Sequence, residues 1–432
     1  MAERVTVIGG GLAGCEAAWQ LARRELDVTL IEMKPLKRSP AHLRDDFAEL
    51  VCSNSLRSDR LENAVGLLKA EMRLLDSVIL QAADETRVDA GGALAVDRAG
   101  FSEMVTRLIT NHPRITVEHR EVTEIPDGHV IIATGPLTSD AFAETIGETV
   151  SNGFLHFYDA AAPIVSLDSI DMSRAFYASR YGKGTPDYIN CGMSEAEYRV
   201  FYEALISAEE AKVHGFEQAK VFEACMPVEV MARRGVDTLR YGPLKPVGLD
   251  HPETGERYYA VAQLRRDNAG GTMYNLVGFQ THLTFGEQKR VFSMIPALRD
   301  AEFLRYGVMH RNTYLDSPRL LDRYYRLRAN KRICFAGQIT GVEGYVESAA
   351  SGLLAGLELA RRMRGEAPLD FPNTTAMGAL ALYVSDESVA AFQPMNVNFG
   401  IIEPLGYRVK GKAEKNAAIS ARGLGVVRGM ID

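Results

Sequence analysis

Short apolar runs alternate with helical patterns at the start of the chain. Residues 5–8 form an apolar run, residues 9–14 are rich in glycine, residues 15–24 have apolar positions at helical spacing, and residues 28–31 form a second apolar run. Apolar runs of this length are typical of buried strands, and the spacing between them is typical of a helix. The pattern therefore predicts two parallel strands joined by a crossover helix.

The same alternation continues to about residue 132 and returns near the end of the chain, but the segment between differs. From about residue 172 to residue 304 the sequence is rich in aromatic residues and in glycine–proline loop signals. This change favours an α/β domain that is interrupted by an inserted domain. The further helices that we expect lie at 63–83 and 344–363, and the further strands at 115–117, 130–132, 258–264, 274–279 and 333–336.

Composition excludes several classes of protein. The 432 residues are 46% hydrophobic and 24% charged, which suits a globular chain with one or two cores. No apolar run approaches the roughly 20 residues of a membrane span, and the N-terminus lacks the pattern of a signal peptide. Five scattered cysteines without a C-x-x-C pair favour a reduced, cytoplasmic protein without disulfides or a metal site. A net charge of -7 opposes indiscriminate binding of nucleic acid but permits a local basic face.

The first glycine-rich turn has the spacing of a dinucleotide-binding fingerprint. Gly9 permits a tight turn, Gly11 lets a pyrophosphate approach the backbone, and Gly14 lets the helix pack closely on the strand. The following helix offers free N–H groups to phosphates, and Glu32 at the end of the next strand can accept hydrogen bonds from ribose hydroxyls. The complete turn consists of Gly9, Gly10, Gly11, Leu12, Ala13 and Gly14.

A second glycine-rich turn indicates which dinucleotide is bound. Gly337 and Gln338 follow an expected strand, and Tyr345 opens the expected helix after them. Flavoproteins place such a helix start against the flavin ring, whereas simple NAD dehydrogenases do not need one, and Gly135 follows a strand as in many FAD enzymes. FAD is therefore the expected cofactor. Tyr345 either stacks on the flavin or is an ordinary core tyrosine.

These elements together predict an α/β fold, with a Rossmann-like FAD-binding domain and an inserted, smaller α+β domain. The first part of the FAD-binding domain covers residues 1–171 and its second part covers residues 305–432. The inserted domain, expected to contact the substrate, covers residues 172–304.

Longer motifs across nearly the whole chain carry a resemblance to a known family. The chain resembles the folate- and FAD-dependent tRNA (uracil-5-)-methyltransferases, the TrmFO family. It departs from the usual pattern at Gly10, at Asp89 and at Gly192, where a glycine in place of proline should loosen a loop. The motifs cover residues 9–14, 16–19, 47–56, 91–98, 309–313, 341–350 and 392–396.

The resemblance implies a specific reaction and specific cysteines. Methylenetetrahydrofolate donates a one-carbon unit, FAD carries it, NAD(P)H supplies electrons, and the product is 5-methyluridine in the T-loop of tRNA. Uracil C5 is a weak nucleophile until a thiolate adds to C6. By resemblance Cys225 is that nucleophile, and Cys52 lies beside the flavin as the base at C5 or another partner in catalysis. Cys15 and Cys334 have the pattern of inert core thiols, and Cys191 fits either interpretation.

Basic residues near the end of the chain provide a candidate RNA surface. Residues 305–332 contain eight basic and two acidic side chains with four tyrosines among them, and the tail adds Arg408, Lys410, Lys412 and Lys415. Charge runs are commonly only solvated faces, and the resemblance is what favours RNA.

Three rival functions stay open at this point. The same chemistry could act on ribosomal RNA, the chain could be a simple FAD-dependent NAD(P)H oxidoreductase, or it could bind flavin and RNA without turnover. Cys52 and Cys225 separate the methyltransferases from the last two, because simple hydride transfer needs neither thiol.

Overall fold

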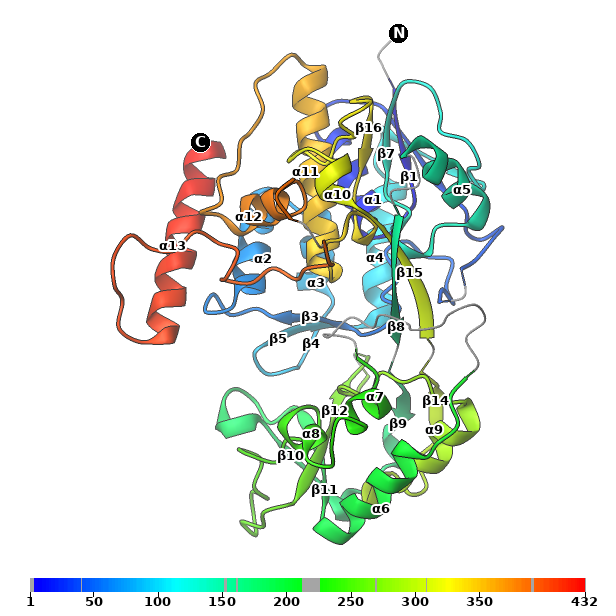
Figure 1. Cartoon of the computed structure of the whole chain (residues 1–432), viewed down its shortest axis with the longest axis vertical. Coiled ribbons are helices and arrows are strands. Elements are labelled where there is room, and N and C mark those ends of the chain that lie inside the picture. The colour runs from blue at the N-terminus through cyan, green and yellow to red at the C-terminus, as the bar shows by residue number, and fades with distance from the viewer. Residues whose placement is uncertain are drawn as a thin grey trace.

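A five-stranded parallel sheet forms the centre of the upper lobe in Figure 1. The computed structural model describes residues 4–39, 41–150, 154–160, 162–211, 226–268, 270–307, 309–389 and 392–431. All four strand pairings are parallel, as the alternation of strands and helices predicts. In spatial order the strands are β16 (Ile333–Phe335), β7 (His129–Ile132), β1 (Val5–Ile8), β2 (Val28–Glu32) and β6 (Ile115–His119).

Two helices from opposite ends of the chain pack directly on each other in this lobe. They are α1 (Leu12–Ala22) and α11 (Tyr345–Met363). A Cβ atom at Gly352 would lie 2.1 Å from the carbonyl oxygen of Ala13, and one at Gly356 would lie 2.7 Å from that of Ala17. Only glycine allows the two backbones to come this close. The contact fixes the second glycine-rich turn beside the first.

The expected helix over residues 63–83 is two helices. α2 (Ala64–Leu74) ends before Asp76, whose φ of 55° is left-handed, and the Ser77 side chain then accepts a hydrogen bond from the Leu80 N–H at the start of α3 (Val78–Glu85). The apolar pattern continues across the break, so it hides both the turn and the cap. The remaining elements of this lobe are β3 (Ser55–Ser58), β4 (Arg87–Val88), β5 (Ala93–Val96), α4 (Arg98–Thr110), α5 (Asp140–Thr149), α10 (Ser317–Leu320), α12 (Ala376–Tyr383) and α13 (Lys412–Ile431).

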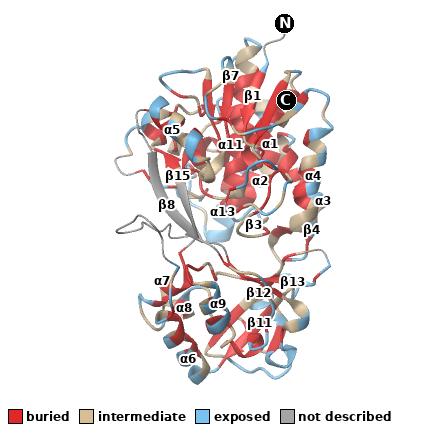
Figure 2. Cartoon of the chain, turned by 90° about the vertical axis from the view of Figure 1, so that its right-hand side faces the viewer, coloured by how far each residue is buried: buried red, intermediate tan, exposed pale blue. Residues whose placement is uncertain are grey.

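A six-stranded antiparallel sheet with its own apolar core forms the lower lobe. Figure 2 shows buried residues gathered in each lobe separately. The boundaries 172–304 remain a prediction. In spatial order the strands are β10 (Ala175–Ala178), β11 (Tyr188–Met193), β12 (Ala260–Arg266), β13 (Met273–Leu276), β9 (Ile164–Ser166) and β14 (Phe303–Arg305), and the helices are α6 (Glu195–Ile206), α7 (Val228–Ala232), α8 (Thr238–Tyr241) and α9 (Phe285–Phe292).

An antiparallel pair of strands, β8 (Phe154–Ala160) and β15 (Met309–Leu315), lies where the chain passes between the two lobes.

Gly192 lies within β11 and not in a loop, so the prediction that this glycine loosens a loop is wrong. A Cβ atom there would lie 2.3 Å from the Tyr258 ring, so the site is tightly packed. No helix among the described residues is both long and apolar enough to cross a membrane.

Candidate active site

A pocket opens in the upper lobe at the carboxyl ends of β1, β2 and β7. Both glycine-rich turns contribute to its wall, together with the turn that contains Gly135. Parallel sheets bind ligands at this edge, because the strand ends and helix starts meet there. The cofactor-binding residues predicted from the sequence that line the pocket are Gly9, Gly10, Gly11, Leu12, Ala13, Glu32, Gly135, Gly337, Gln338 and Tyr345.

The glycines of the first turn have different structural roles. Gly9 has a φ of 103°, and a Cβ there would lie 2.6 Å from the Ala133 carbonyl oxygen. Gly14 lies outside the pocket lining, where a Cβ would lie 1.8 Å from the Gly9 carbonyl oxygen. Gly11 is different, because a Cβ there would meet no protein atom within 4 Å. Gly9 and Gly14 are thus required by the fold, whereas Gly11 faces the open pocket.

Glu32 is a buried carboxylate that is held by backbone donors. Its Oε2 accepts a hydrogen bond of 2.6 Å from the Gly10 N–H, and its Oε1 accepts one of 2.9 Å from the Lys34 N–H. These two donors offset the cost of burying the charge and fix the carboxylate at the pocket wall. Each oxygen retains a lone pair that can accept a hydrogen bond from a ribose hydroxyl.

The residues that line the pocket suit the groups of FAD. The first turn of α1 contains no acidic residue, so its N–H groups are available to a pyrophosphate beside Gly11. Glu32 is placed for the ribose of the adenosine half. Gly337, Gln338 and Tyr345 form the wall contributed by the second turn, where the flavin ring would lie.

Cys52 lies beside this pocket in direct contact with Tyr345. The Tyr345 hydroxyl is 2.9 Å from the Cys52 Sγ, and its oxygen accepts a hydrogen bond of 2.7 Å from the Cys52 N–H. Burial, and next the Cys52 thiol, raise the pKa of Tyr345 well above its ordinary value. The hydroxyl therefore stays protonated at neutral pH, and its hydrogen can be donated to the sulfur.

Three arginines hold the loop on both sides of Cys52. Arg98 donates to the Leu50 carbonyl and forms a salt bridge of 2.8 Å with the buried Asp267. Arg305 donates to the Val51 carbonyl at 2.6 Å. Arg265 donates to the Ser53 Oγ at 2.6 Å and to the Asn54 Oδ1 at 3.2 Å. Because Arg265 and Arg305 belong to strands of the lower lobe, both lobes position the Cys52 loop.

The sequence did not reveal these positioning residues. Arg98 is the last residue of the motif 91–98 that carries the family resemblance, and this position was a signal that its side chain has a functional partner. Arg265 and Asp267 carry no local signal, because their contacts join residues far apart in the chain.

The other cysteines divide as the sequence suggests. Cys15, Cys191 and Cys334 are fully buried. Burial raises the pKa of the Cys191 and Cys334 thiols to about 12, and it raises the pKa of Cys15 further. These thiols are therefore inert at neutral pH, which also settles the open case of Cys191. Cys225 lies outside the described residues.

Most basic side chains that the structure describes in the stretch 305–332 bond to other groups of the protein. Of the seven basic side chains that the structure describes there, four form ion pairs with acidic residues and two donate hydrogen bonds to backbone carbonyls. These pairs are Arg305 with the Val51 carbonyl, Arg319 with Asp316, Arg323 with Asp370, Arg326 with Asp322, Arg328 with Glu387 and Arg332 with the Pro126 carbonyl.

Comparison with known proteins places the chain in a family. Residues 4–367 match the family model described as glucose inhibited division protein A. The methylenetetrahydrofolate–tRNA-(uracil-5-)-methyltransferase TrmFO of Acetivibrio thermocellus is 58% identical over 429 residues, which are 99% of this chain and 98% of that protein. The enzyme of the same name from Bacillus licheniformis is 56% identical over 428 residues, 99% of both chains. The chain belongs to the TrmFO family.

A solved structure supports the fold of this TrmFO family member. GidA of Aquifex aeolicus superposes with a TM-score of 0.71 at 15% sequence identity, over 99% of this chain and 73% of that one. The Rossmann-like α/β fold predicted from the sequence is thereby confirmed.

The open face of Gly11 gives a prediction for flavin binding. Gly11→Val should abolish retention of FAD, because the side chain enters the pyrophosphate path. It should leave the melting temperature of the flavin-free protein nearly unchanged, because no protein atom opposes the new Cβ. Gly286→Val in α9, where a Cβ also meets no atom, is the matched control and should keep FAD. The ratio of flavin to protein absorbance measures how much FAD each variant retains. Full FAD occupancy in Gly11→Val would contradict the placement of the pyrophosphate beside Gly11.

Proposed function

We propose that this chain methylates C5 of the T-loop uridine of tRNA, with methylenetetrahydrofolate as the one-carbon donor and NAD(P)H as the reductant. The observation that carries the proposal is the match to TrmFO enzymes along 99% of the chain, combined with a cysteine beside a pocket that fits FAD. When bound, FAD supplies the electrons that reduce the transferred carbon to a methyl group. Cytoplasm, where tRNA and reduced folates are handled, is the proposed compartment.

Cys52, with Tyr345 as its hydrogen-bond partner, would accept a proton from the substrate in this reaction. The Tyr345 hydroxyl lies 2.9 Å from the Cys52 sulfur and can donate its hydrogen to it, and a hydrogen bond in that direction stabilises a thiolate relative to a thiol. A thiolate held in this way is suited to remove the C5 proton of the uracil ring. Arg98 and Arg305 hold the backbone at Leu50 and Val51, so the sulfur stays beside the pocket wall.

Cys225 is the proposed nucleophile. Its thiolate would add to C6 of uracil, and the electron pair of the C5–C6 double bond would then attack the one-carbon unit through C5. Removal of the C5 proton by Cys52 would break the bond between the transferred carbon and its donor nitrogen and leave an exocyclic methylene. A hydride supplied by the reduced cofactor would convert this methylene into methyl, and cleavage of the bond between sulfur and C6 would restore the C5–C6 double bond and free the Cys225 thiolate. Val228, three residues later, starts α7 and donates to the Gln280 carbonyl at 2.7 Å, which ties this part of the lower lobe down.

The oxidoreductase rival and the RNA-binding rival are not favoured, because both lack a use for a positioned thiol. Ribosomal RNA is disfavoured as the target, because the relatives are named for tRNA. The proposed division by sequence range assigns Cys52 to the FAD-binding domain and Cys225 to the inserted domain.

The direct test follows the one-carbon unit. Unmodified tRNA is incubated with enzyme, NAD(P)H and folate labelled at the methylene carbon, and the RNA is digested to nucleosides. We expect label in 5-methyluridine from the T-loop and none in a transcript with cytidine at the target position. If a parallel incubation labels only a ribosomal RNA fragment, ribosomal RNA is the substrate and not tRNA. Consumption of NAD(P)H without labelled RNA would support the simple oxidoreductase.

The two cysteines give a second prediction. RNA that contains 5-fluorouridine should form an adduct with the wild-type protein that survives denaturation, because fluorine cannot leave as a proton does. Cys225→Ala should form no adduct. Cys52→Ala should still form one but should lose roughly 100-fold or more in methyl transfer, the size of a general-base contribution.

Both variants should retain FAD, and Cys191→Ala, which removes a thiol buried in the other core, is the control that should behave as wild type. Adduct formation is measured by the shift of labelled RNA in a denaturing gel. Undiminished adduct in Cys225→Ala together with its loss in Cys52→Ala would exchange the two roles.

A further inference from the structure

The internal pairing of residues 305–332 leaves the position of the RNA backbone open. Cations without an acidic partner in the protein are the strongest candidates for phosphate contacts, because no carboxylate competes with the phosphate for them. Across the described part of the chain, five clustered candidates form no ion pair. They are Arg60, Arg408, Lys410, Lys412 and Lys415.

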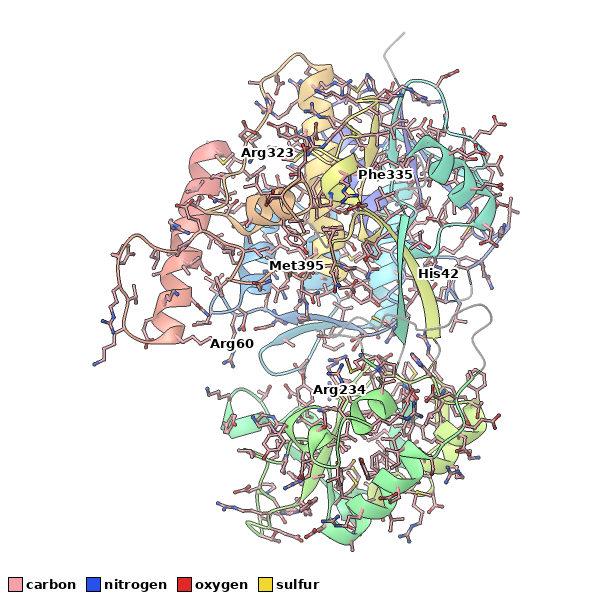
Figure 3. All side chains as sticks on the ribbon, viewed as in Figure 1. His42, Arg60, Arg234, Arg323, Phe335 and Met395 are labelled. Carbon is pink, nitrogen blue, oxygen red and sulfur yellow. The ribbon has the colours of Figure 1, made fainter. Side chains whose placement is uncertain are left out.

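Two of these five cations and one arginine that is paired with an acid border a cleft between α2 and α13. Arg57, Lys412 and Lys415 line it, and the apolar ring of Phe399 forms part of its wall. We name it the α2–α13 cleft. Its other lining residues are Glu62, Asn63, Ala64, Val65, Val397, Asn398, Gly400, Val409, Gly411 and Asn416. Figure 1 shows α13 beside α2 at the edge of the upper lobe, and Figure 3 shows Arg60 at the lower margin of this region.

The electrostatics of the cleft favour an anion. Two long helices begin at it, and the N-terminal end of a helix carries a partial positive charge. The first turn of α2 has no acidic residue, and the side chain of its N-cap, Asn63, forms no capping hydrogen bond. Lys412 and Lys415 stand at the start of α13, where a cation opposes the helix dipole. Against these groups stand two carboxylates, Glu62 on the lining and Glu414 at the start of α13.

The cleft is connected to the Cys52 site. Arg57 forms a salt bridge with Glu347 of α11, and its guanidinium lies 3.2 Å from the position of a Cβ at Gly344. Gly344 directly precedes Tyr345, whose hydroxyl contacts Cys52. One end of the cleft therefore lies beside the turn that carries the active-site tyrosine. A strand of RNA with one base at Cys52 can continue along Arg57 toward α13.

We propose that the α2–α13 cleft holds the sugar–phosphate backbone of the tRNA substrate, with Lys412 and Lys415 as its main phosphate contacts. This inference rests on the proposed function. The paired arginines of 305–332 then serve the fold, and the tail supplies the cations for RNA. Phe399 offers an apolar face for an unpaired base at the same place.

The test reverses the two lysine charges. In Lys412→Glu/Lys415→Glu, the dissociation constant for an unmodified tRNA transcript should rise about tenfold or more. A plot of the logarithm of the association constant against the logarithm of the salt concentration should become less steep, by up to about 1.5. The KM for tRNA should rise more than kcat falls, because the change affects binding and not the chemistry. FAD content should equal that of the wild type.

Two further variants keep the result decisive. Arg107→Glu/Arg428→Glu reverses two exposed charges that have no described ion pair and do not line the cleft, and its affinity for tRNA should stay close to wild type. Lys412→Arg/Lys415→Arg should bind like wild type, whereas the matching glutamine pair should bind more weakly.

Wild-type affinity in both the glutamate and the glutamine pair would overturn the proposal, as would an equal loss in the control pair. A wild-type enzyme that neither binds nor methylates tRNA would instead overturn the proposed function.

Discussion

The close contact between α1 and α11 is the constraint on which the rest of the structure depends. Gly352 and Gly356 let the α11 backbone approach the carbonyls of Ala13 and Ala17, so no side chain separates the two helices. The helices begin at the two glycine-rich turns, and both turns therefore open into one pocket. A flavin site made from residues more than three hundred positions apart thus follows from a packing requirement. The same contact sets the position of Tyr345, the first residue of α11.

Tyr345 connects the flavin pocket with the loop that carries Cys52. Its hydroxyl contacts the thiol, while Arg98, Arg265 and Arg305 hold the neighbouring residues. Two of these arginines come from the lower lobe, so the thiol is correctly placed only when both lobes are docked. Asp267, almost fully buried, neutralises Arg98 within this contact. A buried pair of this type fixes geometry more than it adds stability, which suits a site where the position of a sulfur atom matters.

Local signals in the sequence predicted much of the fold, and contacts distant in sequence were missed. The first strand, the glycine-rich turn and α11 were predicted well because periodicity and glycine spacing are properties of neighbouring residues. The break at Asp76 was missed because the apolar pattern runs through it. The contact of Cys52 with Tyr345 spans 293 positions and has no local trace. That residues 305–332 contact RNA stays a prediction, and composition did not show which of their charges are paired within the protein, because it counts charges without their partners.

The central claim is that the flavin pocket, the Cys52 thiol and the RNA act as one site. Enzyme with reduced flavin, kept free of oxygen, is mixed with methylenetetrahydrofolate, with unmodified tRNA, or with both, while flavin absorbance and 5-methyluridine are measured together. The account predicts that flavin is oxidised only when both are present, with one flavin oxidised for each methyl group formed. Oxidation of the flavin by folate without tRNA at the same rate, or methylation of tRNA while the flavin stays reduced, would contradict it.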